Sequence, residues 1–197
     1  MLKNLAVLVA FSVAGVAATD LHLNNLAFNT PCLKYNELRN AGHMDIGVLL
    51  VVKDERVRAA TSEALNRWSQ VIDMTWHEDR TSTCALTIVE APVAGFRYYS
   101  GDRLVTNIPP RTARAQLPQN ADTFKGIVFV NTARLLSLDK YWMADAMQHE
   151  LGHLFGYNSH SDNPRSIMYW NVTGDNQKLQ KEDVKVIARY HKTVLHF

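Results

Sequence analysis

The sequence HELGHLFGYNSH, residues 149–160, carries the strongest functional signal in the chain. His149 and His153 are four residues apart, so on a helix their imidazoles lie on one face and can bind the same divalent metal ion. Glu150 projects from the same turn but is offset from the histidine pair. It is therefore placed to act as a general base on a water held by the metal without displacing a ligand.

Gly156 and His160 predict how a third metal ligand is supplied. Glycine is typical of the left-handed turn that ends a helix, so the chain can turn back towards the metal after Gly156. His160 follows this turn and is the predicted third ligand, which leaves the fourth tetrahedral position open for water. An open position is typical of a catalytic zinc site.

A methionine follows in the sequence SIMY, residues 166–169, after a turn-forming segment at residues 162–164. Together with the histidine motif, this sequence resembles the metzincin metallopeptidases and, within that clan, the matrixins. The matrixin motif HExxHxxGxxH is followed by a serine and then by a methionine-containing turn, and here His160-Ser161 and SIMY correspond to both. One position differs, because Ser159 occupies the usual place of the third ligand. We interpret this difference as a one-residue insertion before His160.

The resemblance implies an α+β catalytic domain with a twisted mixed β-sheet, two long helices, the zinc motif on the second helix and a C-terminal helix. It also implies a secreted zinc-dependent endopeptidase with one zinc ion, held by His149, His153 and His160. Glu150 would assist the attack of a zinc-bound water on the peptide bond of an extended protein or peptide substrate.

Two residues after the zinc motif receive roles from the same resemblance. Met168 would shape the floor beneath the zinc without being a ligand. Tyr169 is either a wall residue of the pocket beside the scissile bond or a packing residue.

The N-terminal sequence predicts export. Residues 1–18, MLKNLAVLVAFSVAGVAA, combine a basic residue, an apolar run and small residues at the expected cleavage site, as in a signal peptide. The alternative is an uncleaved N-terminal anchor. No later segment approaches ~20 consecutive apolar residues, so we expect a secreted protein that does not associate with membranes after cleavage.

The remaining chain has the size of one domain. About 179 residues follow the signal peptide, and an apolar content of 47% is sufficient for a core. We expect an N-terminal extension over residues 19–44 and the catalytic domain over residues 45–197, in a monomeric protein. The formal charge of +2 is too small, and the basic residues are too scattered, for a nucleic-acid partner.

The chain contains two cysteines, Cys32 and Cys84, and an even number in an exported chain favours a disulfide between them. The alternative is a latency switch, because many matrixins are inhibited by a propeptide cysteine that caps the zinc. The usual propeptide motif is absent around Cys32, and residues 20–44 are few for a folded prodomain.

Hydrophobic patterns predict the strands and the other helices. Residues 45–52 predict a strand buried on both faces, and residues 74–77, 85–89 and 126–130 predict further strands. A helix over residues 54–71 has its apolar positions on one stripe. These positions are Val57, Ala60, Ala64, Trp68 and Val71.

Two more helices are expected in the C-terminal half. The helix that carries the zinc motif should begin near Leu138, with Ser137 as its N-cap, and end at about Phe155. A last helix over residues 178–192 has an amphipathic pattern. Its apolar positions are Leu179, Val184, Val186, Ile187 and Tyr190.

The segment of residues 91–123 is rich in glycine and proline and is long for a loop, which indicates a functional or mobile region. The resemblance to matrixins is poor here. It implies an edge strand that pairs with the substrate, and residues 113–118, ARAQLP, are the best local match.

The same comparison predicts the absence of further metals. Arg114 stands where animal matrixins carry a zinc-binding histidine, and Val128 and Val130 stand where they carry a histidine and an acidic residue. Arginine cannot lose its proton to become a ligand, and valine offers no lone pair. Asp102 and Asp122 are too isolated to supply the several oxygens that calcium requires. We therefore expect one catalytic zinc, no structural zinc and no calcium.

Two alternative functions remain open. One is a secreted binding or interaction module whose zinc is structural, which would need a fourth protein ligand, and Asp162 is the nearest candidate. The other is a catalytically inactive interaction protein, which the retention of Glu150 disfavours.

Overall fold

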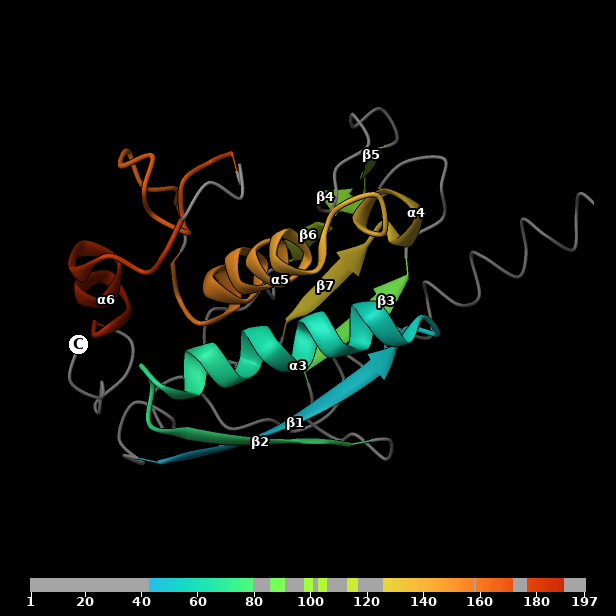
Figure 1. Cartoon of the computed structure of the whole chain (residues 1–197), viewed down its shortest axis with the longest axis horizontal. Helices are drawn as coiled ribbons and strands as arrows, with labels where there is room; N and C mark the ends of the chain where they lie inside the picture. The colour runs from blue at the N-terminus through green and yellow to red at the C-terminus, as the bar shows by residue number, and fades with distance from the viewer. Residues whose placement is uncertain are drawn as a thin grey trace, which may run out of the picture.

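The computed structural model describes residues 43–79, 86–90, 98–100, 103–105, 113–116, 126–157, 159–171 and 177–189 (Figure 1). The predictions made for the signal peptide, Cys32, Cys84, Asp102 and Asp122 concern residues outside these ranges and remain predictions. In the described part of the chain, no helix is both long and apolar enough to cross a membrane.

The centre of the fold is a five-stranded sheet with the order β2-β1-β3-β7-β6. Strands β1 (Met44–Val51), β2 (Met74–Glu78), β3 (Leu86–Glu90) and β7 (Ile127–Val130) are parallel. Strand β6 (Ala113–Gln116) pairs antiparallel with β7 and forms one edge of the sheet. The expected mixed sheet is thus confirmed, and so is a strand within the ARAQLP segment.

A second, smaller sheet was not expected from the sequence. Strands β4 (Tyr98–Ser100) and β5 (Arg103–Val105) form an antiparallel pair within the long segment between β3 and β6. Such short strands are hard to recognise because three residues hold too little of an alternating pattern.

The expectation that the first strand is buried on both faces is wrong. Met44, Ile46 and Val48 are buried, whereas Asp45 is exposed and Val51 is 42% exposed. Side chains alternate between the two faces of a strand, and the buried set belongs to the core that includes the long helices. The opposite side of β1 therefore keeps contact with solvent.

Helix α3 (Glu55–Ser69) covers the sheet with the predicted apolar stripe. Its buried residues include Val57, Ala60, Ala64 and Trp68, and Val71 is buried just beyond its end. Figure 1 shows α3 running along β1, next to helix α5 (Lys140–Leu154).

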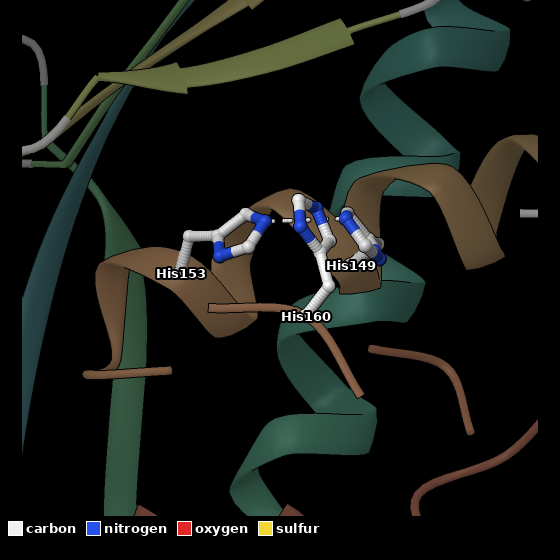
Figure 2. A group of neighbouring side chains, drawn as sticks. All are labelled: His149, His153 and His160. Atoms are coloured by element: carbon white, nitrogen blue, oxygen red, sulfur yellow. Dashed lines mark hydrogen bonds between the residues drawn. The ribbon is translucent and has the colours of Figure 1, made fainter. Parts of the chain in front are cut away.

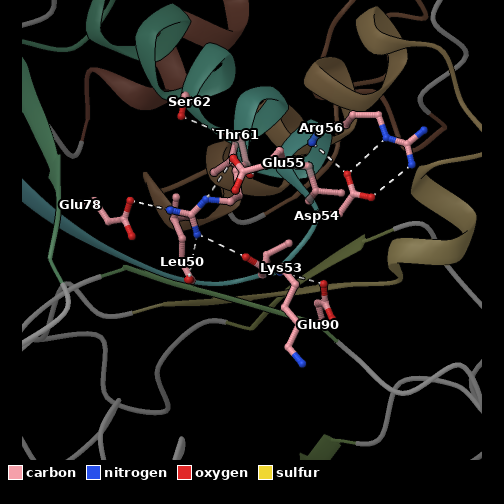
Figure 3. Close-up of polar contacts among 12 residues, drawn as sticks. Leu50, Lys53, Asp54, Glu55, Arg56, Thr61, Ser62, Glu78 and Glu90 are labelled. Atoms are coloured by element: carbon pink, nitrogen blue, oxygen red, sulfur yellow. Dashed lines mark hydrogen bonds and ion pairs between the residues drawn. The ribbon is translucent and has the colours of Figure 1, made fainter.

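Polar contacts fix the start of α3 to the ends of the neighbouring strands (Figure 3). Asp54 caps the helix by accepting a hydrogen bond from a main-chain N–H of the first turn. The adjacent N–H of Lys53 donates to Glu90 at the end of β3, at 3.1 Å. Arg58 forms an ion pair of 2.6 Å with Glu78 at the end of β2. These contacts fix the position of the start of α3 relative to β2 and β3.

Helix α5 begins two residues later than expected, and its N-cap is Asp139 rather than Ser137. The Asp139 carboxylate accepts hydrogen bonds from the N–H groups of Tyr141 and Trp142. The Ser137 hydroxyl instead donates to the carbonyl of Arg134, because the short helix α4 (Thr132–Leu135) ends there. The predicted end at about Phe155 is confirmed.

The last helix, α6 (Lys181–Ile187), is shorter than the predicted range. Lys178 precedes it in an extended connection that pairs with Arg165 and Ile167 through main-chain hydrogen bonds. Leu179, Val184 and Ile187 are buried as expected, and Tyr190 lies outside the described residues.

Candidate metal centre

Three imidazoles converge at one end of α5. His149 and His153 lie one turn apart on this helix, and His160 lies on the segment that follows it (Figure 2). One ligand atom from each of the three rings lies within 4.8 Å of the others. Among the described residues, this is the group of histidine, cysteine and acidic side chains with the geometry to hold a metal ion.

Main-chain carbonyls orient the two helical histidines. Nδ1 of His149 donates to the carbonyl of Ile167 at 2.7 Å, and Nδ1 of His153 donates to the carbonyl of Tyr157 at 2.6 Å. A carbonyl only accepts hydrogen bonds, so in both rings Nδ1 carries the hydrogen. In the neutral rings, the lone pairs therefore reside on the Nε2 atoms.

The two Nε2 atoms are 3.2 Å apart, which is an unfavourable arrangement of two lone pairs unless a cation lies between them. Four ligands at about 2.0–2.1 Å from a tetrahedral zinc ion are separated by about 3.3–3.4 Å, in agreement with this spacing. The pKa of His153 is lowered, chiefly by burial, which favours the neutral form that binds metal. The residues present thus fit a zinc ion.

The predicted turn after α5 delivers His160 to the group. Gly156 has a φ of 113°, the left-handed conformation that glycine adopts at little cost, and Tyr157 N–H donates to the carbonyl of Gly152 at 3.0 Å. The ring centroid of His160 lies 5.3 Å from that of His149 and 5.0 Å from that of His153. Ser159 and Asp162 are exposed and do not belong to the group.

Glu150 follows the first histidine and is half-buried. Its Oε2 atom accepts a hydrogen bond from the main-chain N–H of Ala115 in β6. The carboxylate is therefore in contact with the edge strand of the sheet, 35 residues away in the sequence.

The methionine predicted beneath the site is Met168. It is fully buried, and its sulfur lies so close to α5 that a Cβ added at Gly152 would be 2.4 Å away from it. The main-chain carbonyl of Met168 accepts a hydrogen bond of 2.8 Å from the N–H of Ser161, next to His160. The methionine turn therefore packs under the helix and fixes the loop that carries the third histidine.

Comparison with protein families gives a result that agrees with this geometry. The model of the matrixin family, Peptidase_M10, matches residues 47–192. The chain belongs to the matrixin family. A search of curated protein sequences found no match. Matrixins are zinc metallopeptidases, so the family and the histidine group indicate the same metal.

A buried carboxylate that supports the methionine turn of this matrixin was missed in the sequence. Asp183 of α6 is fully buried, and its Oδ2 accepts hydrogen bonds from the Ser166 hydroxyl at 2.6 Å and from Gln180 N–H at 2.8 Å. Ser166 Oγ in turn accepts from the N–H of Met168 at 2.9 Å. Burial raises the pKa of Asp183.

One signal could have identified this residue. Gln180 and Asp183 are separated by the spacing of a capping box, which places the carboxylate of the third helical residue back at the start of its helix. The spacing does not show that Ser166 lies there too, because that contact joins segments 17 residues apart.

Tyr169 and Trp170 continue the chain on the outer side of the methionine turn. Their rings are 5.6 Å apart, Tyr169 is half-buried, and Trp170 is 66% exposed. The two roles predicted for Tyr169, pocket wall and packing, both remain predictions.

Proposed function

We propose that this matrixin is a secreted zinc-dependent endopeptidase that cleaves proteins or peptides bound in an extended conformation. The observation that carries the proposal is the convergence of His149, His153 and His160 in a chain whose Glu150 directly follows the first histidine. Three histidine ligands leave one tetrahedral position for a reacting molecule.

The three histidines would hold one zinc ion, which when bound polarises a scissile carbonyl and makes water more acidic. Their orientation is supported by the carbonyls of Ile167 and Tyr157, which keep the Nε2 atoms of the helical histidines available. Glu150 would take a proton from the attacking water and transfer it to the leaving amine.

The free edge of the sheet is the reason for proposing that the substrate binds in an extended conformation. Among the described residues, strand β6 pairs with β7 on one side and with no strand on the other, and a peptide can add to such an edge through main-chain hydrogen bonds. Export is supported by the signal-like sequence of residues 1–18.

Glu150→Gln tests the reaction. The variant should keep its zinc content but lose about a hundredfold to ten-thousandfold in the hydrolysis of casein or gelatin, because a positioned base contributes a factor of that size. Glu55→Gln, at an exposed position on α3, is the matched control and should retain full activity.

Zinc content and hydrolysis should be measured on the same preparations, with and without a chelator. Hydrolysis by Glu150→Gln at the wild-type rate would refute the proposed role of the carboxylate. Zinc-loaded wild-type protein that cleaves neither substrate would instead favour the binding module with a structural zinc.

A further inference from the structure

Strand β6, the proposed site of substrate pairing, also contacts the proposed general base Glu150. Glu150 lies on α5, and the hydrogen-bond donor is not a side chain but the main-chain N–H of Ala115. Main-chain groups of a sheet are held in place by the neighbouring strands, so they are more rigid donors than long side chains.

The strand register shows which way this donor points. In an antiparallel pair, residues alternate between exchanging hydrogen bonds with the partner strand and pointing their main-chain groups away from it. Ala115 is opposite Val128 of β7, yet its N–H donates to Glu150. Ala115 and, two residues earlier, Ala113 are therefore the residues of β6 whose N–H groups point to the open edge.

The open edge is also where an extended peptide would pair with the sheet. Such a peptide forms hydrogen bonds with the outward N–H and carbonyl groups of an edge strand. The outward N–H of Ala115 is already used by the Glu150 carboxylate. The position of the base and the pairing of the substrate are thus linked through one residue of β6.

We propose that the main-chain N–H of Ala115 is a positioning group for Glu150, which fixes the rotation of the carboxylate before substrate arrives. This inference rests on the proposed peptidase function. A carboxylate that is free to rotate loses entropy when it reaches its reactive orientation, and a preformed hydrogen bond removes part of that cost from the catalytic step. Ala115 contributes through its backbone, so the effect does not depend on its methyl side chain.

Replacing the amide with an ester removes this donor without adding bulk. Incorporation of L-lactic acid in place of Ala115 converts the N–H into an oxygen. The same replacement of Ala113 removes the other outward N–H of β6, which faces the substrate rather than Glu150, and serves as the contrasting variant. Hydrogen bonds to charged groups are worth roughly ten- to hundredfold, so kcat of the Ala115 ester should fall by that factor relative to the Ala113 ester. The Ala113 ester should instead show a higher KM at an unchanged kcat, because it loses a donor to the substrate. KM of the Ala115 ester and the zinc content of both esters should match those of the wild type.

Hydrogen exchange of the metal-free protein tests the bond independently of activity. The Ala115 amide should exchange at least about tenfold faster in Glu150→Ala than in the wild type, because an edge amide without its acceptor is open to water. Exchange of the Ala113 amide should not respond to this substitution.

The outcomes separate this inference from the proposed function. Equal kcat values of the two esters, or an effect of the Ala115 ester confined to KM, would overturn the positioning role while wild-type cleavage still supports the peptidase. Unchanged exchange of the Ala115 amide in Glu150→Ala would overturn it as well. Absence of wild-type cleavage would refute the peptidase itself.

Discussion

The indole N–H of Trp68 donates a hydrogen bond of 2.9 Å to the main-chain carbonyl of Gln148, the residue before the first histidine of the metal centre. Arg67, its neighbour on α3, donates to Asp145 at 2.6 Å and to the Gln148 side chain at 3.2 Å. Helix α3 is therefore hydrogen-bonded to the main chain of α5 at the residue next to His149. The metal centre rests on a packed pair of helices.

Trp68→Phe should destabilise the fold. Phenylalanine can keep the edge-to-face contact with Phe155, whose ring centroid is 5.5 Å away, but it loses the hydrogen bond and some buried volume. We expect a loss of about 1–3 kcal/mol in the free energy of unfolding, measured with denaturant on the zinc-loaded protein.

Trp76→Phe is the control for Trp68→Phe, because Trp76 donates to Asn66 at a more exposed position. It should cost less than about 1 kcal/mol. Equal costs for the two substitutions would contradict the special role of Trp68.

The sequence predicted the parts of the site that depend on local spacing. His149 and His153 share a helix face, and Gly156 supplies the left-handed turn, so neither feature requires knowledge of the rest of the fold. The apolar stripe of α3 was equally clear, because 15 residues contain about four helical turns.

The contacts between distant segments could not be predicted in this way. The bond from Ala115 to Glu150 depends on which edge of the sheet lies next to α5, and the amide that forms it is common to nearly all residues. From the sequence alone, Asp183 is expected to be a solvent-exposed residue of an amphipathic helix. The N-cap of α5 was misplaced because Ser137 and Asp139 are both favourable capping residues, and only the end of α4 decides between them.

His160→Ala should weaken zinc binding far more than Ser159→Ala or Asp162→Ala. His160 is the member of this segment whose ring lies with those of His149 and His153, and imidazole is a much better zinc ligand than a hydroxyl. Competition with a chromophoric chelator measures the dissociation constant of each variant. If Asp162→Ala weakens zinc binding more than His160→Ala does, the carboxylate of Asp162 is the third ligand. The interpretation of a one-residue insertion before His160 would then be wrong.

Asp183→Asn should change how stability depends on pH. Burial raises the pKa of Asp183 in the folded protein, so the folded state binds the proton more tightly than the unfolded chain does. The stability supplied by that proton is complete below the unfolded pKa of about 4 and is lost as the pH rises through the folded pKa. Asparagine keeps an acceptor for Ser166 but does not titrate.

The free energy of unfolding of metal-free Asp183→Asn should therefore improve relative to the wild type as the pH is raised from about 4 to 7. Asp162→Asn, at an exposed position, is the matched control. A constant difference between Asp183→Asn and the wild type over this range would show that the buried carboxylate has no raised pKa.

Gly152→Ala should destabilise both the fold and the metal centre, although helix propensity alone predicts the opposite. Alanine is favoured over glycine within a helix by about 1 kcal/mol. At Gly152, however, a Cβ would lie 2.4 Å from the sulfur of Met168 and 2.9 Å from the ring of Trp68, both of which are fully buried. Overpacking of this kind costs about 1–3 kcal/mol, so we expect a net loss in the free energy of unfolding.

Gly152→Ala should also weaken zinc binding, because it displaces the methionine turn. Displacement of Met168 moves the neighbouring Ile167 carbonyl, which accepts the hydrogen bond that orients His149, so zinc should dissociate faster from Gly152→Ala. Gly47→Ala is the control, because its Cβ would lie 3.1 Å from the side chain of Asp79, far along the chain from the centre, and zinc dissociation should be unchanged. Stabilisation by Gly152→Ala, with unchanged zinc dissociation, would show that the methionine turn adapts to the added methyl group and does not set the orientation of His149.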